Sequence, residues 1–146
     1  MQNKRRKFIF PLFVLYYKKS SKQGGISIMK KIAIIRCHDV SMRCGATGCL
    51  RAFNEKDKAF APYGDEELRL VSLMTCNGCG QTVENDPGLK KKLDRLIEKQ
   101  VDVVHLSHCT SKKDKDNPDN RHTCPWIVKI ADYLKQNGIQ VVEGTH

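Results

Sequence analysis

The chain has 146 residues, a length that forms one domain with a hydrophobic core and needs no disulfide bonds for stability. Its seven cysteines cannot all pair within the chain, because the number is odd, and this disfavours a secreted disulfide scaffold. The net charge is +10, but residues 1–28 carry seven basic and no acidic residues, which leaves 19 basic against 16 acidic residues elsewhere. The body of the protein therefore gives no electrostatic indication of a nucleic-acid partner.

The first 28 residues are predicted to lie outside the folded domain, which occupies residues 29–146. A basic cluster precedes the apolar run Phe8–Tyr17, as in a secretory signal, but lysines follow the run where small residues would mark a cleavage site. The run has ten residues, whereas a span of the bilayer needs about 20. Adjacent glycines at 24–25 are compatible with a ribosome-binding sequence in the gene, so we expect Met29 to be the true start. A basic and apolar segment for membrane association or secretion is the alternative.

The first half of the domain alternates strand and helix. Residues 31–37 form a short apolar run rich in β-branched residues, which predicts a buried strand. A helix is predicted at 47–56, and a second strand, with weaker alternation, at 67–73. Residues 88–100 place apolar side chains on one face and lysines on the other, which is the pattern of an amphipathic helix.

The second half continues this alternation. Strands are predicted at 101–107 and 139–144, on either side of a helix at 125–138 that begins with Pro125 and ends at a glycine. Residues 111–122 are charged and rich in turn-forming residues, so they predict a solvated loop or a mobile cover over the neighbouring edge of the sheet.

The resulting order, β-α-β-α-β-α-β, predicts an α/β fold. We expect a single-domain, three-layer sandwich with a four-stranded, mostly parallel sheet in the Rossmann-like or flavodoxin-like order 2-1-3-4. In such a sheet the carboxyl ends of all strands point to one edge, where open α/β folds keep their functional sites.

The cysteines all fall in loops or helix starts that follow predicted strands, and the last residue follows the fourth strand directly. These residues are Cys37, Cys44, Cys49, Cys76, Cys79, Cys109, Cys124 and His146. Neighbouring strands lie about 4.8 Å apart, and sulfur ligands of tetrahedral zinc lie roughly 3.7 Å apart. Because small loop adjustments bring thiolates from adjacent strand ends onto one ion, we predict that all eight residues are metal ligands at the carboxyl edge of the sheet.

The pair Cys76 and Cys79 has a second interpretation, as a redox dithiol. A reactive CxxC pair normally lies at a helix N-terminus, which lowers the pKa of its first thiol. Here Pro87 marks the predicted start of the helix, well beyond the pair, and this favours metal binding. Cys124 precedes Pro125 at a predicted helix N-cap, which suits either a metal ligand or a reactive thiol.

The histidines differ in their expected roles. His105 lies within a predicted strand and is expected to be a hydrogen-bonded core residue. His38, His108 and His122 lie near the cysteine edge and are weaker ligand candidates than His146.

Several segments together resemble the CGGC-domain family, a group of small, cysteine-rich prokaryotic proteins. They are MKKIAIIRC, RCGATGC, AFNEKDKAFAPYGDEE, TCNGC, VVHLSHC, CPWI and VVEGTH. The resemblance spans residues 29–146 and implies zinc binding, with the seven cysteines and His146 matching the family pattern. Asn77 stands where the family name predicts glycine, and asparagine tolerates the positive φ angle that a glycine there would imply.

The sequence thus predicts a cytoplasmic metal-binding α/β protein. Zinc is the expected metal and an iron–sulfur cluster is the alternative, because thiolates select soft or borderline metals over magnesium and calcium. Two other hypotheses stay open: a thiol-disulfide redox protein that uses Cys76 and Cys79, with Cys109 or Cys124 as resolving thiol, and an interaction module with a purely structural metal. The predicted partner is a metal ion; no nucleic acid is indicated, and no membrane for residues 29–146.

Overall fold

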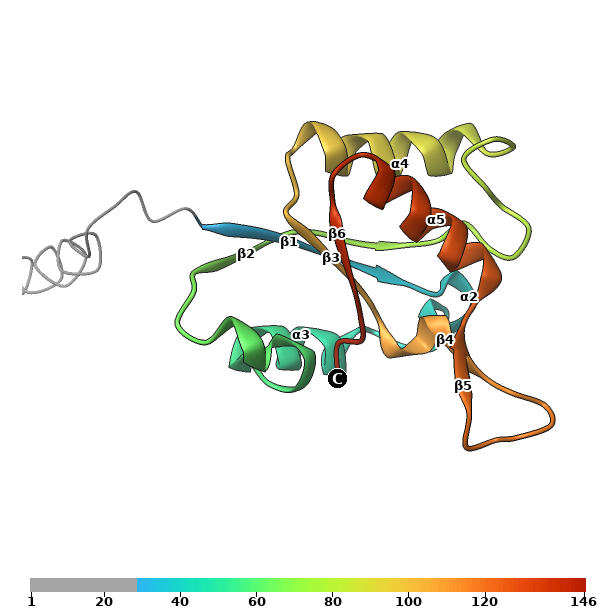
Figure 1. The fold of residues 1–146 in the computed structure, drawn as a ribbon, viewed down its shortest axis with the longest axis horizontal. Coiled ribbons are helices and arrows are strands. Elements are labelled where there is room, and N and C mark those ends of the chain that lie inside the picture. The colour runs from blue at the N-terminus through green and yellow to red at the C-terminus, as the bar shows by residue number, and fades with distance from the viewer. Residues whose placement is uncertain (1–28) are drawn as a thin grey trace, which may run out of the picture.

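A central sheet of four parallel strands organises the computed structural model, which describes residues 29–146 (Figure 1). The expectations for residues 1–28 lie outside the described residues. The strands are β1 (Lys30–Arg36), β2 (Leu68–Thr75), β3 (Val103–Leu106) and β6 (Gln140–Glu143). Their spatial order is β2-β1-β3-β6 and each neighbouring pair is parallel, so the predicted order 2-1-3-4 is confirmed.

Helices cover both faces of the sheet, which confirms the three-layer arrangement (Figure 1). One face carries α4 (Pro87–Glu98) and α5 (Pro125–Gln136). The other face carries α3 (Thr47–Glu55) and the 3-10 helix η1 (Lys58–Tyr63). The three longer helices match the helical patterns of the sequence, because each has an apolar stripe that packs on the sheet.

Two short elements follow strands directly at the carboxyl edge. Helix α2 (His38–Ser41) comes after β1, and the 3-10 helix η2 (His108–Thr110) comes after β3. Neither was predicted, since a single turn is too short to show a helical period. Within residues 29–146, no helix is long and apolar enough to cross a membrane.

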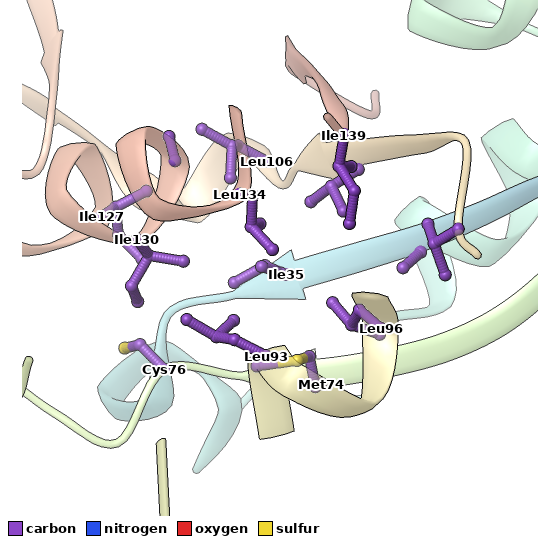
Figure 2. Packing of buried hydrophobic residues seen from close by; sticks show 14 of the residues in the cluster. Ile35, Met74, Cys76, Leu93, Leu96, Leu106, Ile127, Ile130, Leu134 and Ile139 are labelled. Atoms are coloured by element: carbon purple, nitrogen blue, oxygen red, sulfur yellow. The ribbon is translucent and has the colours of Figure 1, made fainter. Parts of the chain in front are cut away.

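The core has two halves because the central strand β1 is buried on both faces. Ile32, Ala33, Ile34 and Ile35 are all fully buried, as the apolar run predicts. Side chains alternate along a strand, so Ala33 and Ile35 pack toward α4 and α5, whereas Ile32 and Ile34 pack toward α3 and η1. Figure 2 shows Ile35 among leucines and isoleucines of α4 and α5, with Cys76 at one end of the same cluster.

The start of α4 is fixed by Asp86, its N-cap. The Asp86 carboxylate accepts hydrogen bonds from the backbone N–H of Gly88 (2.9 Å) and of Leu89 (3.1 Å), and Pro87 takes the first helical position. The side-chain amide of Asn77 and these backbone donors lower the pKa of Asp86. The predicted delay between the CxxC pair and the next helix is therefore confirmed.

The charged segment 111–122 begins and ends in the strands of a β-hairpin, so the prediction of a solvated loop holds only for residues 114–120 between them. Strands β4 (Ser111–Lys113) and β5 (Arg121–Thr123) pair antiparallel and project away from the main sheet (Figure 1). The Arg121 guanidinium donates to the hydroxyl and the carbonyl of Ser111 and thereby closes the hairpin. The strands have three residues each and no apolar alternation, so no period in the sequence indicates them.

Candidate functional site

The cysteines lie at or near the carboxyl edge of the sheet because each follows a strand or begins the helix behind it. Cys37 follows β1, Cys76 and Cys79 follow β2, Cys109 lies in η2 after β3, and Cys124 is the N-cap of α5. All seven cysteines are free thiols. They fall into two groups that differ in burial and in neighbours, with Cys44 apart from both.

Two sulfur atoms extend the hydrogen bonding of the sheet beyond the end of β1. The N–H of Cys76 donates to the carbonyl of Arg36 (2.9 Å), and the N–H of His38 donates back to the sulfur of Cys76 (3.3 Å), where a parallel ladder would use a carbonyl. On the other side, the N–H of Cys37 donates to the sulfur of Cys109 (3.2 Å). Two consecutive amides that follow the central strand thus hold one sulfur from each side.

A cavity of about 210 Å³ opens beside these sulfurs, between the end of the sheet and the start of α5. The cysteines that line this thiol pocket are Cys37, Cys76, Cys79 and Cys124. Their exposure is graded, because Cys37 and Cys76 are buried, Cys124 is half-buried and Cys79 is exposed. Apolar side chains of Met42, Trp126 and Ile127 form much of the remaining wall. Cys109 is not part of this lining, although its sulfur lies beside the Cys37 amide.

One lysine reaches the thiol pocket from the hairpin. Lys112, in β4, places its Nζ 3.8 Å from the sulfur of Cys37. Lys112 thus brings a basic side chain to the wall of the pocket beside Cys37. The carboxylate of Asp39 also lines the pocket, but it is exposed and pairs with Arg43 at 3.5 Å.

The loop between Cys76 and Cys79 is shaped by glycine and not by Asn77. Gly78 has a φ of 108°, whereas Asn77 has no positive φ, so the expectation of a left-handed conformation at Asn77 is wrong. The Asn77 amide instead donates to the carboxylate of Asp86 (2.8 Å), the N-cap of α4. Asn77 therefore ties the CxxC loop to the helix that follows it.

Cys49 forms a second group, on the α3 face of the sheet. Its thiol is 2% exposed in the first turn of α3, and its sulfur lies 3.1 Å from Ser107 Oγ and 3.3 Å from Thr145 Oγ1. The same sulfur lies 3.7 Å from Nδ1 of His146. Gly48 leaves space for that imidazole, because a Cβ atom at position 48 would lie 3.2 Å from the His146 ring. The structure thus joins two of the eight predicted ligands, Cys49 and His146, but away from the thiol pocket.

Cys44 belongs to neither group. It is half-buried in the connection between α2 and α3 and lines neither the thiol pocket nor the group around Cys49. The backbone N–H of Ala46 and the guanidinium of Arg36 lower the pKa of the Cys44 thiol. Its thiolate is therefore favoured at a place separate from the other sulfurs.

His105 is a buried structural residue, as predicted. Its Nδ1–H donates to the carbonyl of Gly144 (2.9 Å), and its Nε2 accepts from the Tyr63 hydroxyl (2.7 Å). The ring also stacks on Phe60, with 4.2 Å between centroids. Desolvation lowers the pKa of His105, which favours the neutral imidazole in the folded protein.

The other histidines are dispersed. His38 lines the thiol pocket, whereas His122 pairs with Asp114 in the hairpin. The ring of His108 lies 6.0 Å from that of His146, between centroids. Within residues 29–146, no three His, Cys, Asp or Glu side chains are already arranged as a metal ion requires. The fit of the site to a metal therefore rests on its donors: sulfur atoms that a rotation about χ1 can redirect.

Sequence reasoning missed two features of the pocket, Lys112 and Trp126. Lys112 stood in a segment predicted to be a solvated loop, and nothing in a run of charges marks one lysine as inward-facing. Trp126 follows Pro125 in the first turn of α5, and its place beside Cys124 was the one available signal.

The fold and its thiol-lined edge define an α/β protein with a cysteine-rich site. The family model described as the CGGC domain matches residues 31–146, so the chain belongs to the CGGC domain family, and the resemblance in the sequence is confirmed. A relative from Methanocaldococcus jannaschii, "Uncharacterized protein MJ0582", is 31% identical over 130 residues, which cover 80% of this chain and 86% of the relative. No solved structure matches the chain.

Proposed function

We propose that the protein binds a soft or borderline metal ion through the thiolates of the thiol pocket, with zinc as the first candidate and an iron–sulfur cluster as the second. The observation that carries this proposal is the convergence of four cysteines from three separate segments on one cavity. Sulfur donors without a competing carboxylate cluster suit these metals better than magnesium or calcium.

Hydrogen-bond donors and one basic side chain surround the sulfurs. The N–H groups of Cys37 and His38 donate to the sulfurs of Cys109 and Cys76, and Nζ of Lys112 lies 3.8 Å from the sulfur of Cys37. Thiols must lose their protons to bind a metal, and these protons pass to the solvent, so affinity should rise with pH. Reduced thiols persist in the cytoplasm, which is the compartment that we propose.

Metal at the pocket would join the ends of β1 and β2 to the start of α5. Cys37, Cys76, Cys79 and Cys124 would be its ligands, because all four line the same cavity. Cys44, Cys49 and His146 lie outside that cavity, so we propose the four pocket cysteines as the principal site.

A second candidate function is thiol-disulfide exchange by Cys76 and Cys79. The unequal exposure of the pair favours it, because Cys79 is exposed and Cys76 is buried. The Cys79 thiolate would attack a sulfur of a substrate disulfide and release one substrate thiolate. Cys76 would then attack Cys79 in this mixed disulfide, so that the substrate leaves as a dithiol and the pair becomes a disulfide.

The two candidates are separated by purifying the full chain without oxygen and measuring metal per chain, visible absorption and free thiols. Stoichiometric zinc without a visible band supports the zinc form, and a broad brown absorption supports an iron–sulfur cluster. Metal-free protein with a reversible Cys76–Cys79 disulfide would contradict the metal proposal and establish the second candidate.

A further inference from the structure

The thiol pocket is a cavity of limited size that is lined by two thiols of unequal exposure. Cys76 is buried and Cys79 is exposed, and both belong to the lining. The volume of about 210 Å³ lies below the range of about 300–1,000 Å³ that is usual for sites enclosing a whole drug-sized ligand. The pocket therefore has room for one small organic group beside the thiols.

The walls of the pocket indicate the chemistry of that group. Met42, Trp126 and Ile127 offer an apolar surface, which suits a short carbon chain. Cys76 and Cys79 lie in the same lining and, as a dithiol, can exchange with a sulfur–sulfur bond. A small disulfide meets both conditions, because each of its sulfurs carries a carbon group.

The charged groups of the pocket favour an anionic substrate. Among the described residues, Lys112 is the one Lys or Arg side chain that lines the cavity, and its Nζ lies 3.8 Å from the sulfur of Cys37. The lining carboxylate of Asp39 is exposed and pairs with Arg43. A carboxylate on the substrate would thus meet a basic side chain inside the pocket, where the apolar wall strengthens the contact.

We propose that the thiol pocket takes one half of a low-molecular-weight disulfide whose two halves carry carboxylates, and that Lys112 determines this preference. The inference rests on the second candidate function, thiol-disulfide exchange by Cys76 and Cys79. It applies to the metal-free protein, because a metal held by the four pocket cysteines would occupy the reacting sulfurs.

The exchange balances without any further reductant. The Cys79 thiolate attacks one sulfur of the substrate, the substrate S–S bond breaks, and the other half leaves as a thiolate. Cys76 then attacks the sulfur of Cys79, breaks the mixed disulfide and releases the second half. Two electrons pass from the protein dithiol to the substrate, and the two thiol protons reach the released halves through the solvent. The products are one Cys76–Cys79 disulfide and two small thiols.

The test compares three small disulfides that differ in charge: dithiodiglycolate, bis(2-hydroxyethyl) disulfide and cystamine. Each is mixed with the reduced, metal-free full chain, and the first turnover is followed by the fluorescence of Trp126, the single tryptophan of the sequence, which lines the pocket. Because the disulfides differ in intrinsic reactivity, every rate is divided by the rate of the same disulfide with dithiothreitol, an uncharged dithiol.

The expected order of the normalised rates follows the charge. The rate for dithiodiglycolate should exceed that for bis(2-hydroxyethyl) disulfide about tenfold or more, and cystamine should react most slowly. Mass spectrometry of the product should find the Cys76–Cys79 disulfide. Equal normalised rates for the three disulfides would overturn the proposal.

Two lysine variants provide the matched comparison. In Lys112→Met, the normalised rates for the anionic and the neutral disulfide should agree within about twofold, while the reaction of the neutral disulfide is retained. Lys113 is an exposed neighbour in the same strand that does not line the pocket, so Lys113→Met should keep the preference. A preference that persists in Lys112→Met would contradict the assignment of Lys112.

Failure of thiol-disulfide exchange itself is recognised separately, with insulin as a protein disulfide. If the metal-free chain reduces insulin but none of the three small disulfides, the exchange function stands and the proposed substrate class is wrong. If it reduces neither, or if Cys79→Ser reacts with the small disulfides as fast as wild type, the second candidate function is wrong and the inference falls with it.

Discussion

The two cysteine groups of this protein share one edge of a sheet but differ in what surrounds their sulfurs. In the thiol pocket, four cysteines line an open cavity next to Lys112 and backbone N–H donors. On the α3 face, Cys49 is buried and its sulfur is surrounded by Ser107, Thr145 and His146. The first arrangement leaves sulfur accessible for a ligand, whereas the second uses sulfur within a closed hydrogen-bonded group. Position after a strand therefore does not by itself define a metal ligand.

The largest expected effect separates the two groups by metal affinity. Cys76→Ser should lower zinc affinity by roughly 100-fold or more, because it removes a proposed ligand that the His38 amide holds in place. Cys49→Ser is the matched control and should change the affinity by less than about threefold. Competition with a chromophoric chelator measures both. Equal losses in the two variants would show that the groups act as one site.

The next effect separates the groups by stability. Cys49→Ala should destabilise the metal-free protein by about 1–2 kcal/mol, because it empties space in the core and removes a partner of two buried hydroxyl groups. Cys79→Ala should change the free energy of unfolding by less than about 0.5 kcal/mol, since Cys79 is exposed. Urea unfolding under reducing conditions measures the change in free energy of unfolding for both variants. A larger loss in Cys79→Ala than in Cys49→Ala would contradict the comparison.

A pH dependence is expected on the α3 face, where His105 holds the carbonyl of Gly144. Burial lowers the pKa of His105 in the folded state, whereas the unfolded chain keeps a value near about 6.5. The unfolded state therefore binds more protons below about pH 6.5, and stability falls as the pH decreases through that value.

Urea unfolding at a series of pH values measures this slope. His105→Leu should flatten it, because the variant has no imidazole to titrate at that position. An unchanged slope in His105→Leu would assign the pH dependence to other groups.

The smallest effect concerns Gly48. A Cβ at this position would lie 3.2 Å from the His146 ring, which is an exposed side chain that can shift. Gly48→Ala should therefore be neutral or stabilise the protein by up to about 1 kcal/mol through helix propensity, while the NMR signals of the His146 ring move. Destabilisation beyond about 1 kcal/mol would show that His146 is held more firmly than a surface contact.

The fold was predictable because its strands and longer helices carry strong periodic signals. The run from Ile32 to Ile35 marks a strand that is buried on both faces, and the stripe from Leu89 to Leu96 marks α4. The hairpin was not predictable, because Lys112 and its neighbours pair through the backbone without an apolar pattern.

The gathering of cysteines at one edge of the sheet was predictable, but their division between the two faces was not. Parallel strands bring their carboxyl ends to one edge, so the gathering of cysteines followed from topology. Which face receives a residue depends on backbone turns after each strand, and these turns are local: Cys49 enters α3 on one face, whereas Cys76 joins the core on the other. The spacing of the cysteines along the sequence does not show which face of the sheet each of them reaches.

The sulfur of Cys76 accepts the N–H of His38 at the point where the sheet would otherwise use a carbonyl oxygen. The last hydrogen bond between the ends of β1 and β2 therefore depends on the chemical state of a thiol. Alkylation, oxidation or metal ligation at Cys76 changes the acceptor of the last rung between β1 and β2. The exchange rate of the His38 amide proton should therefore change when the sulfur of Cys76 is modified. NMR can measure this rate without any label on the cysteine.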